Sequence, residues 1–116
     1  MKDPKDFSDI QEIREIIDQI DFNILKLFGD RNRCVEEIVN FKTSKAGIIA
    51  NKRQKELIAV RREWAKTFNL DPDLYEKIFK MLIKSNIKKE LIIFAQKESN
   101  IAELTKIHRE NVQRKH

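Results

Sequence analysis

The sequence has very few of the residues that turn or break a chain. Two glycines and two prolines among 116 residues leave almost no material for β-hairpins and tight turns. The single cysteine excludes an intramolecular disulfide, and no apolar run approaches the roughly 20 residues of a membrane span. The opening stretch MKDPKDFSDIQ is partly acidic and lacks an apolar core, so we expect no signal peptide and a cytoplasmic protein.

The chain is rich instead in charged residues and in apolar residues at helical spacing. Charged residues make up 37% and apolar residues 41% of the sequence, which is enough apolar material for one core. We therefore predict an all-α protein with one helical domain. The net charge of +5 favours anionic partners, but it does not distinguish a nucleic acid from a small carboxylate.

The first predicted helix is very long and spans residues 9–43. Ser8 and Gln11 form a capping-box pattern before a 3-4 apolar rhythm that crosses Gly29 without a shift of phase. At 1.5 Å per residue this helix is about 50 Å long, whereas a compact globule of this size is roughly 35 Å across. One copy of the chain cannot cover such a helix, so we predict an intertwined homodimer.

Two further helices are predicted after the loop TSKAGIIAN. The second spans residues 51–68, with Asn51 as its cap. Its expected inner face consists of Leu57, Val60, Trp64 and Phe68. Helix end and start signals follow at Asn69, Asp71 and Pro72.

The third predicted helix runs from residue 72 to residue 97, where Ser99 and Asn100 interrupt it. We accordingly divide the chain into a helical domain, residues 1–97, and a basic C-terminal extension, residues 98–116, which is a short helix or disordered.

Two cations stand out within the apolar pattern of the first helix. Arg31 occupies a position that the rhythm assigns to an apolar residue, and Lys42 lies eleven residues further on, close to three helical turns and about 16 Å along the axis. If both side chains project from one face, the gap between their charged ends suits a small dicarboxylate. The alternative is that both side chains extend from the edge of the core into solvent.

Glu90 is a carboxylate among apolar residues of the third helix. Ile83, Ile87 and Phe94 share its face; an ionised carboxylate is costly there unless it is paired, because burial disfavours the charge. One interpretation is a structural salt bridge to Arg31, Lys42 or Arg53. The other is a protonated acid that donates a hydrogen bond to a substrate oxygen.

Other polar residues give weaker signals. Arg14 flanks the apolar stripe and either pairs with Glu15 and Asp18 or reaches the site of an antiparallel partner chain. Cys34 is expected to be buried and inert. His108 and His116 show no metal-ligand spacing, so we expect no metal and no cofactor.

With these residues the chain resembles the type II, all-α chorismate mutase family. The stretches that carry the resemblance are IREIIDQID, FGDRNRCVEEIVNFK, NKRQKEL and IKKEL, and the likeness covers roughly residues 3–96. The opening KDPKDF, the loop FKTSKAGIIANKR and the stretch REWAKTFNLD look most like the isochorismate-pyruvate lyase branch of salicylate and siderophore biosynthesis.

The resemblance implies an intertwined homodimer with two identical sites and no cofactor. Lys42 and Glu90 are the implied catalytic residues, with Lys42 at the ether oxygen of the substrate. Arg14 is contributed across chains. The implied substrate-binding residues are Arg14, Arg31, Arg53, Asn86 and Gln54.

The sequence departs from the family pattern in two respects. Glu90 stands where a neutral glutamine is common, so we expect the activity to fall as the pH rises through the pKa of Glu90. Ala50 and Gln54 replace two acidic residues that bind the hydroxyl of chorismate, which favours a lyase over a dedicated mutase.

We therefore expect an isochorismate-pyruvate lyase with chorismate mutase side activity. The alternatives are a monofunctional chorismate mutase of the shikimate pathway and, remotely, a basic helical dimer that binds nucleic acid, with a salt-dependent affinity.

Overall fold

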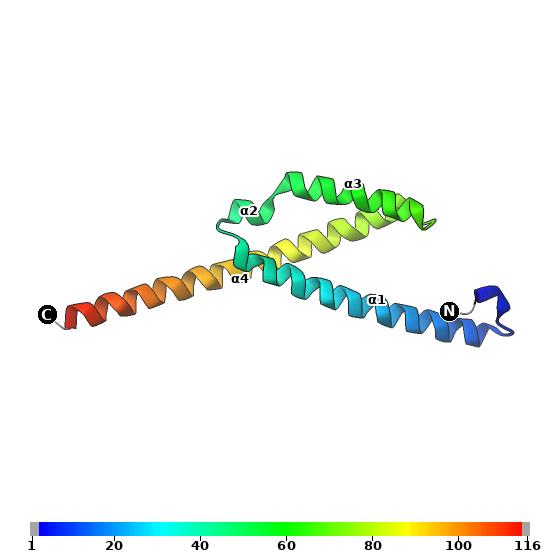
Figure 1. Cartoon of the computed structure of the whole chain (residues 1–116), viewed down its shortest axis with the longest axis horizontal. Helices are drawn as coiled ribbons and strands as arrows, with labels where there is room; N and C mark the ends of the chain where they lie inside the picture. Colours follow the sequence, from blue (N-terminus) through cyan, green and yellow to red (C-terminus); the bar gives the residue numbers. More distant parts are fainter. Residues whose placement is uncertain (1–2, 115–116) are drawn as a thin grey trace. The chain divides into compact units, whose positions relative to one another are not determined.

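The computed structural model describes residues 3–114 and is all-α, with no strand in that range. Figure 1 shows the helices in chain order: η1 (Pro4–Asp6), α1 (Ile10–Ile38), η2 (Val39–Phe41), α2 (Lys45–Ile49), α3 (Asn51–Thr67) and α4 (Pro72–Arg114). The chain divides after Cys34 into two compact units. None of the described helices is long and apolar enough to cross a membrane. His116, for which no ligand role was expected, lies outside the described residues.

Helix α1 confirms the long first helix and corrects both of its ends. The side chain of Asp9, not Ser8, accepts the backbone N–H of Glu12 at 2.9 Å and so caps the helix. The helix crosses Gly29 without a break, then ends at Ile38 and tightens into η2. Lys42 follows in an extended conformation, with φ −90° and ψ 136°. The prediction that Arg31 and Lys42 share one helical face was therefore wrong.

Most apolar side chains of α1 are exposed in the single chain. Ile17 is 49% exposed, Ile24 43% and Leu27 65%, and α1 contains no buried residue. Cys34 is also exposed, which corrects the expected buried thiol. In proteins most of the stability of a helix comes from the packing of its apolar face.

The expected loop between the first two long helices contains a further helix, α2. The hydroxyl of Ser44 accepts the backbone N–H of Gly47 at 3.2 Å and caps it. Helix α3 then starts at Asn51, which is its first helical residue and not its cap. The cap position is Ala50, whose methyl side chain cannot accept a hydrogen bond. The expected role of Asn51 was therefore wrong.

The turn between α3 and α4 agrees with the prediction. Asn69 has a φ of 57°, the left-handed conformation that ends many helices. Asp71 accepts the backbone N–H of Asp73 at 3.0 Å, and Pro72 is the first residue of α4.

The face that α3 turns toward the core differs from the predicted one. Ile58 and Ala65 are its buried residues, whereas Val60, Trp64 and Phe68 are exposed to 42%, 54% and 71%. The guanidinium of Arg61 stacks over the Trp64 ring, 4.4 Å from its centroid. Of the predicted inner face, Leu57 is half-buried, so the most buried side chains of α3 lie on a neighbouring face.

Helix α4 is a single helix that continues through the expected break. Ser99 and Asn100 are helical, because each costs only about 0.5 kcal/mol of helix propensity and neither is a proline or a glycine. The core of the second unit forms where α4 meets η2 and α2: Val39, Ile48 and Phe94 are buried there. Beyond this core, residues 98–113 of α4 are exposed, and Figure 1 shows this end of α4 continuing past α2 and α3.

Candidate active site

The centre of the candidate site is a pair of buried polar residues on α4. Asn86 and Glu90 are each only 8% exposed, and they lie four residues apart, hence on one face of the helix. A helix face that buries two polar side chains side by side is unusual, since each needs a polar partner. This arrangement marks the position as a functional candidate.

Burial raises the pKa of Glu90 above its ordinary value, and the positive charge of Lys42 partly offsets this effect. Lys42, one of the three partners considered from sequence, therefore acts on Glu90. A carboxyl group with a raised pKa keeps its proton to higher pH and can donate a hydrogen bond. The site therefore combines a lysine with a buried carboxyl group whose pKa is raised.

The segment between η2 and α2 positions Lys42. Val39 and Ile48, on either side of this segment, are both buried against Phe94 of α4. A Cβ atom added at Gly47 would lie 3.7 Å from Cδ of Lys42, so the aliphatic part of the lysine passes over this glycine. Lys42 is therefore anchored at both ends of its loop and along its side chain.

A groove of about 590 Å³ lies between α3 and α4. Ile58, Ile83 and Ile87 provide apolar lining, and Gln54 borders the groove from the first turn of α3. The side-chain amide of Gln54 donates to the carbonyl of Ile49, which ties α3 to α2. Arg53, its neighbour, is exposed. Ile87 is one turn before Glu90, so the groove and the buried carboxyl share one stretch of α4.

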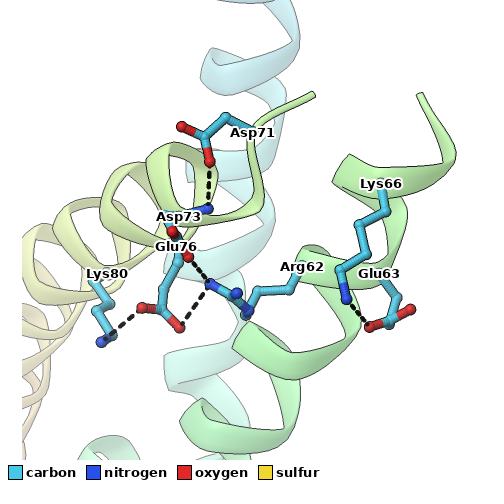
Figure 2. Close-up of polar contacts among 7 residues, drawn as sticks. All are labelled: Arg62, Glu63, Lys66, Asp71, Asp73, Glu76 and Lys80. Carbon is cyan, nitrogen blue, oxygen red and sulfur yellow. Dashed lines mark hydrogen bonds and ion pairs between the residues drawn. The ribbon is translucent and has the colours of Figure 1, made fainter. Parts of the chain in front are cut away.

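The same groove is lined by more positive than negative charge. An ionic cluster holds α3 to the start of α4: Arg62 contacts Asp73 at 2.9 Å and Glu76 at 3.6 Å, and Lys80 contacts Glu76 at 3.3 Å. Figure 2 shows these side chains meeting between the two helices. Lys55 and Lys84 add two further cations to the lining.

Of the predicted site residues, the structure brings Lys42, Asn86 and Glu90 together within the second unit and places Gln54 at the groove. Arg14 and Arg31 belong to the first unit. Arg14 is exposed, and within residues 3–114 it forms no ion pair with Glu15 or Asp18. The expected local pairing of Arg14 was therefore wrong.

Sequence reasoning missed the groove. Its lining residues Lys55 and Lys84 look like ordinary surface lysines on a helix, and Ile58 was outside the predicted inner face. The sequence signal for this groove was the 3-4 spacing of Ile58, Arg62 and Ala65, which lie on α3 beside the predicted inner face.

Comparison with known proteins identifies the family of this all-α chain. A family model described as chorismate mutase type II matches residues 13–91, which is more than half of the chain. The chain belongs to the type II chorismate mutase family. The matched range includes Lys42 and Glu90 and stops at Leu91, before the exposed part of α4.

Two curated relatives of this family member carry different names. It is 33% identical over 96 residues to the isochorismate pyruvate lyase of Pseudomonas aeruginosa strain PAO1, a match that covers 83% of this chain and 95% of that protein. It is 37% identical over 79 residues to the chorismate mutase of Methanocaldococcus jannaschii, which covers 66% of this chain and 79% of the relative. Family membership and both relatives indicate an enzyme.

Proposed function

We propose that this chorismate mutase family member is an isochorismate-pyruvate lyase that converts isochorismate to salicylate and pyruvate, with chorismate mutase side activity. The observation that carries the proposal is the buried Glu90 beside Lys42, in a chain that resembles a lyase over almost the whole length of that relative. The same cationic site suits both substrates, since each is a small dicarboxylate with an ether bond.

The proposed reaction needs no covalent intermediate with the protein. The ether C–O bond breaks, one ring hydrogen moves to the methylene carbon of the enolpyruvyl group, and the ring becomes aromatic. Negative charge develops on the ether oxygen as this bond breaks. The ammonium of Lys42 stabilises that charge, and protonated Glu90 donates a hydrogen bond to the same oxygen.

The remaining residues bind and orient the substrate in this proposal. Arg14 and Arg31 hold the two carboxylates, since a guanidinium binds a carboxylate through two parallel hydrogen bonds. The supporting residues are Arg53, Gln54 and Asn86. Holding the substrate in a compact, reactive conformer supplies a further part of the rate enhancement.

Support for the lyase over the mutase comes from the junction of α2 and α3. Ala50 and Gln54 provide no carboxylate there, so the site lacks the acidic pair expected for the hydroxyl of chorismate. The alternative function, a monofunctional chorismate mutase that forms prephenate, is favoured by the identity to the Methanocaldococcus relative and by the ability of the Gln54 amide to bind a hydroxyl.

We further propose a homodimer in which α1 of a second copy covers the α3–α4 groove. The exposed apolar face of α1, including Ile10, Ile17 and Ile20, suits the apolar lining of the groove. The first half of α1 also carries the acidic residues Glu12, Glu15, Asp18 and Asp21, which complement the excess of cations in the groove. Arg14 of one chain would then reach the site of the other.

The proposed activity is tested by offering the purified protein isochorismate and chorismate separately. We expect salicylate fluorescence from isochorismate and slower formation of prephenate from chorismate. Prephenate formation with no salicylate would support the mutase instead. If neither product forms, even at mildly acidic pH, the proposed reaction is wrong.

The cross-chain role of Arg14 is tested by mixing two inactive variants, Arg14→Ala and Lys42→Gln. After subunit exchange, one of the two sites of a mixed dimer carries both native residues, so about a quarter of the native activity should return. An unexchanged mixture is the control. If exchange is shown by mass and no activity returns, Arg14 does not act across chains.

A further inference from the structure

An ion pair joins the last turn of α1 to α4 beside the candidate site. The ammonium of Lys89 lies 2.6 Å from a carboxylate oxygen of Glu36, and the two side chains are 56% and 37% exposed. Glu36 precedes Lys42 by six residues, and Lys89 is the direct neighbour of Glu90 in the sequence. The pair therefore links the two segments that carry the proposed catalytic residues.

A second polar contact joins the same two segments. The ammonium of Lys97 donates to the backbone carbonyl of Asn40 at 3.5 Å. In each segment the buried residue of the core, Val39 or Phe94, lies in sequence between the two contacts. Two lysines of α4 thus hold η2 and the end of α1 on either side of the packed core.

The polar contacts supply what the apolar core cannot. The hydrophobic effect has no direction, so the packing of Val39 on Phe94 sets the distance between η2 and α4 more strongly than the angle at which they cross. Hydrogen bonds and close ion pairs depend on direction. A polar contact on each side of the core therefore restricts that angle.

A change in this angle reaches Lys42 through a short, hydrogen-bonded stretch of backbone. The last turn of α1 continues directly into η2, and the backbone N–H of Lys42 donates to the carbonyl of Val39 at 3.1 Å. Ile48 anchors the other end of the loop in the same core. The Glu36–Lys89 pair therefore acts on the end of the loop that carries Lys42.

From these contacts we propose that Glu36 and Lys89 are positioning residues: their ion pair holds the end of α1 on α4 so that the ammonium of Lys42 stays beside the carboxyl group of Glu90. Neither residue of the pair touches the substrate. The effect on the reaction rests on the proposed function, whereas the geometry that the pair maintains is a property of the chain itself. An exposed ion pair contributes little to stability, so its loss should change the site more than the fold.

The first test measures the position of Lys42 without the reaction, through the titration of Glu90. Burial raises the pKa of Glu90 and Lys42 lowers it, so this pKa should rise further when the ammonium moves away. Carbon-13 NMR of the carboxyl groups follows the titration, and the signal of Glu90 is assigned by its absence in Glu90→Gln. We expect a raised pKa of Glu90 both in Glu36→Gln and in Lys89→Gln.

The two variants distinguish a movement of Lys42 from a direct effect of the lost charge. Removal of the negative charge of Glu36 would by itself lower the pKa of Glu90, whereas removal of the positive charge of Lys89 would raise it. Opposite shifts in the two variants, or no shift in either, would overturn the proposal. The matched control is Lys66→Gln, which breaks an exposed 3.0 Å ion pair with Glu63 within α3 and should leave the pKa of Glu90 unchanged.

The second test uses the reaction with isochorismate. Glu36→Gln and Lys89→Gln should each lower kcat about three- to tenfold and change KM less than about twofold, because Lys42 acts on charge that develops only in the transition state. The double variant Glu36→Lys/Lys89→Glu should restore kcat to within about threefold of the native value, because the ion pair forms again with reversed sign.

A double variant as slow as the single variants, with helix content retained, would show that the ion pair does not position Lys42. A native protein that is inactive with isochorismate would contradict the proposed function alone. In that case the titration of Glu90 still decides whether the pair holds Lys42 in place, since it needs no substrate.

Discussion

Helix α4 contains two regions that use one face of the same helix in opposite ways. In residues 72–97 this face is buried, yet it includes two polar residues, Asn86 and Glu90. In residues 98–113 the face is exposed, yet it presents Ile101 and Leu104. Polar groups inside and apolar groups outside are both costly arrangements, so each of the two regions needs its own explanation.

The first region extends six residues beyond Leu91, where the family match ends. Up to that point η2 and α2 pack on α4 and position Lys42 beside Glu90. Beyond Phe94, the ammonium of Lys97 donates to the backbone carbonyl of Asn40 at 3.5 Å, and residues 98–113 are exposed. A common fold therefore explains the first region, whereas the second must be explained by the residues of this chain alone.

The largest expected effect separates the two regions by stability. Phe94→Ala should reduce the free energy of unfolding by about 3 kcal/mol or more, because it leaves a cavity where Phe94 packs on Val39 and Ile48. Leu104→Ala, the matched change in the exposed region, should cost less than about 1 kcal/mol when urea unfolding is measured at low protein concentration. Equal losses would mean that α4 has a single continuous core.

The next effect concerns catalysis. Lys42→Gln removes the charge and keeps most of the side chain that passes over Gly47, so the fold should survive. We expect the activity with isochorismate to fall about 10²- to 10³-fold, the loss typical of one electrostatic donor at a developing anion. Lys106→Gln in the exposed region is the control and should retain native kcat/KM. A loss below tenfold for Lys42→Gln would remove this lysine from the reaction.

A smaller, pH-dependent effect is expected at Glu90. In the proposed reaction the protonated form of Glu90 is the active one, so the native activity should fall as the pH rises through the raised pKa of Glu90. Glu90→Gln supplies a permanently neutral donor and should flatten this profile. Rates measured from mildly acidic to alkaline pH provide the test, and a native profile without such a fall would contradict the proposed role.

Glu90 should also link stability to pH, with a defined sign. Burial makes the folded-state pKa higher than the unfolded value near 4.5, so the folded protein binds the proton more tightly. Its contribution to stability is complete below the unfolded pKa and is lost as the pH rises through the folded pKa. Glu90→Gln should therefore be more stable than the native chain at neutral pH, and the two should converge at acidic pH.

Sequence reasoning predicted the long helices because their apolar periodicity is strong. It identified Asn69, Asp71 and Pro72 correctly, since each acts through local backbone chemistry. It failed where tertiary contacts decide. The stripe of α3 that packs on α4 was confused with a second apolar stripe that includes Trp64, because periodicity shows that a face is apolar and not which neighbour it meets.

The sequence likewise predicted only part of the candidate site. Glu90 stood out because a carboxylate among isoleucines is locally inconsistent, and the structure confirms its burial. The position of Lys42 was argued from an unbroken helix that in fact ends at Ile38. The lysine acts on Glu90 because η2 and α2 fold back onto α4, a long-range contact that no local pattern in the first helix contains.

The smallest expected effect is at the other end of α4, where ion pairs link its first turns to Arg62 of α3. Arg62→Ala should reduce the free energy of unfolding by less than about 1 kcal/mol, because Asp73 is 77% exposed and water screens such pairs. Adding salt should reduce the difference further. A double-mutant cycle with Glu76→Gln isolates the pair from the rest of the side chain. A coupling well above 1 kcal/mol would mean that this cluster, and not only the core around Phe94, fixes the position of α3 on α4 and hence the width of the groove.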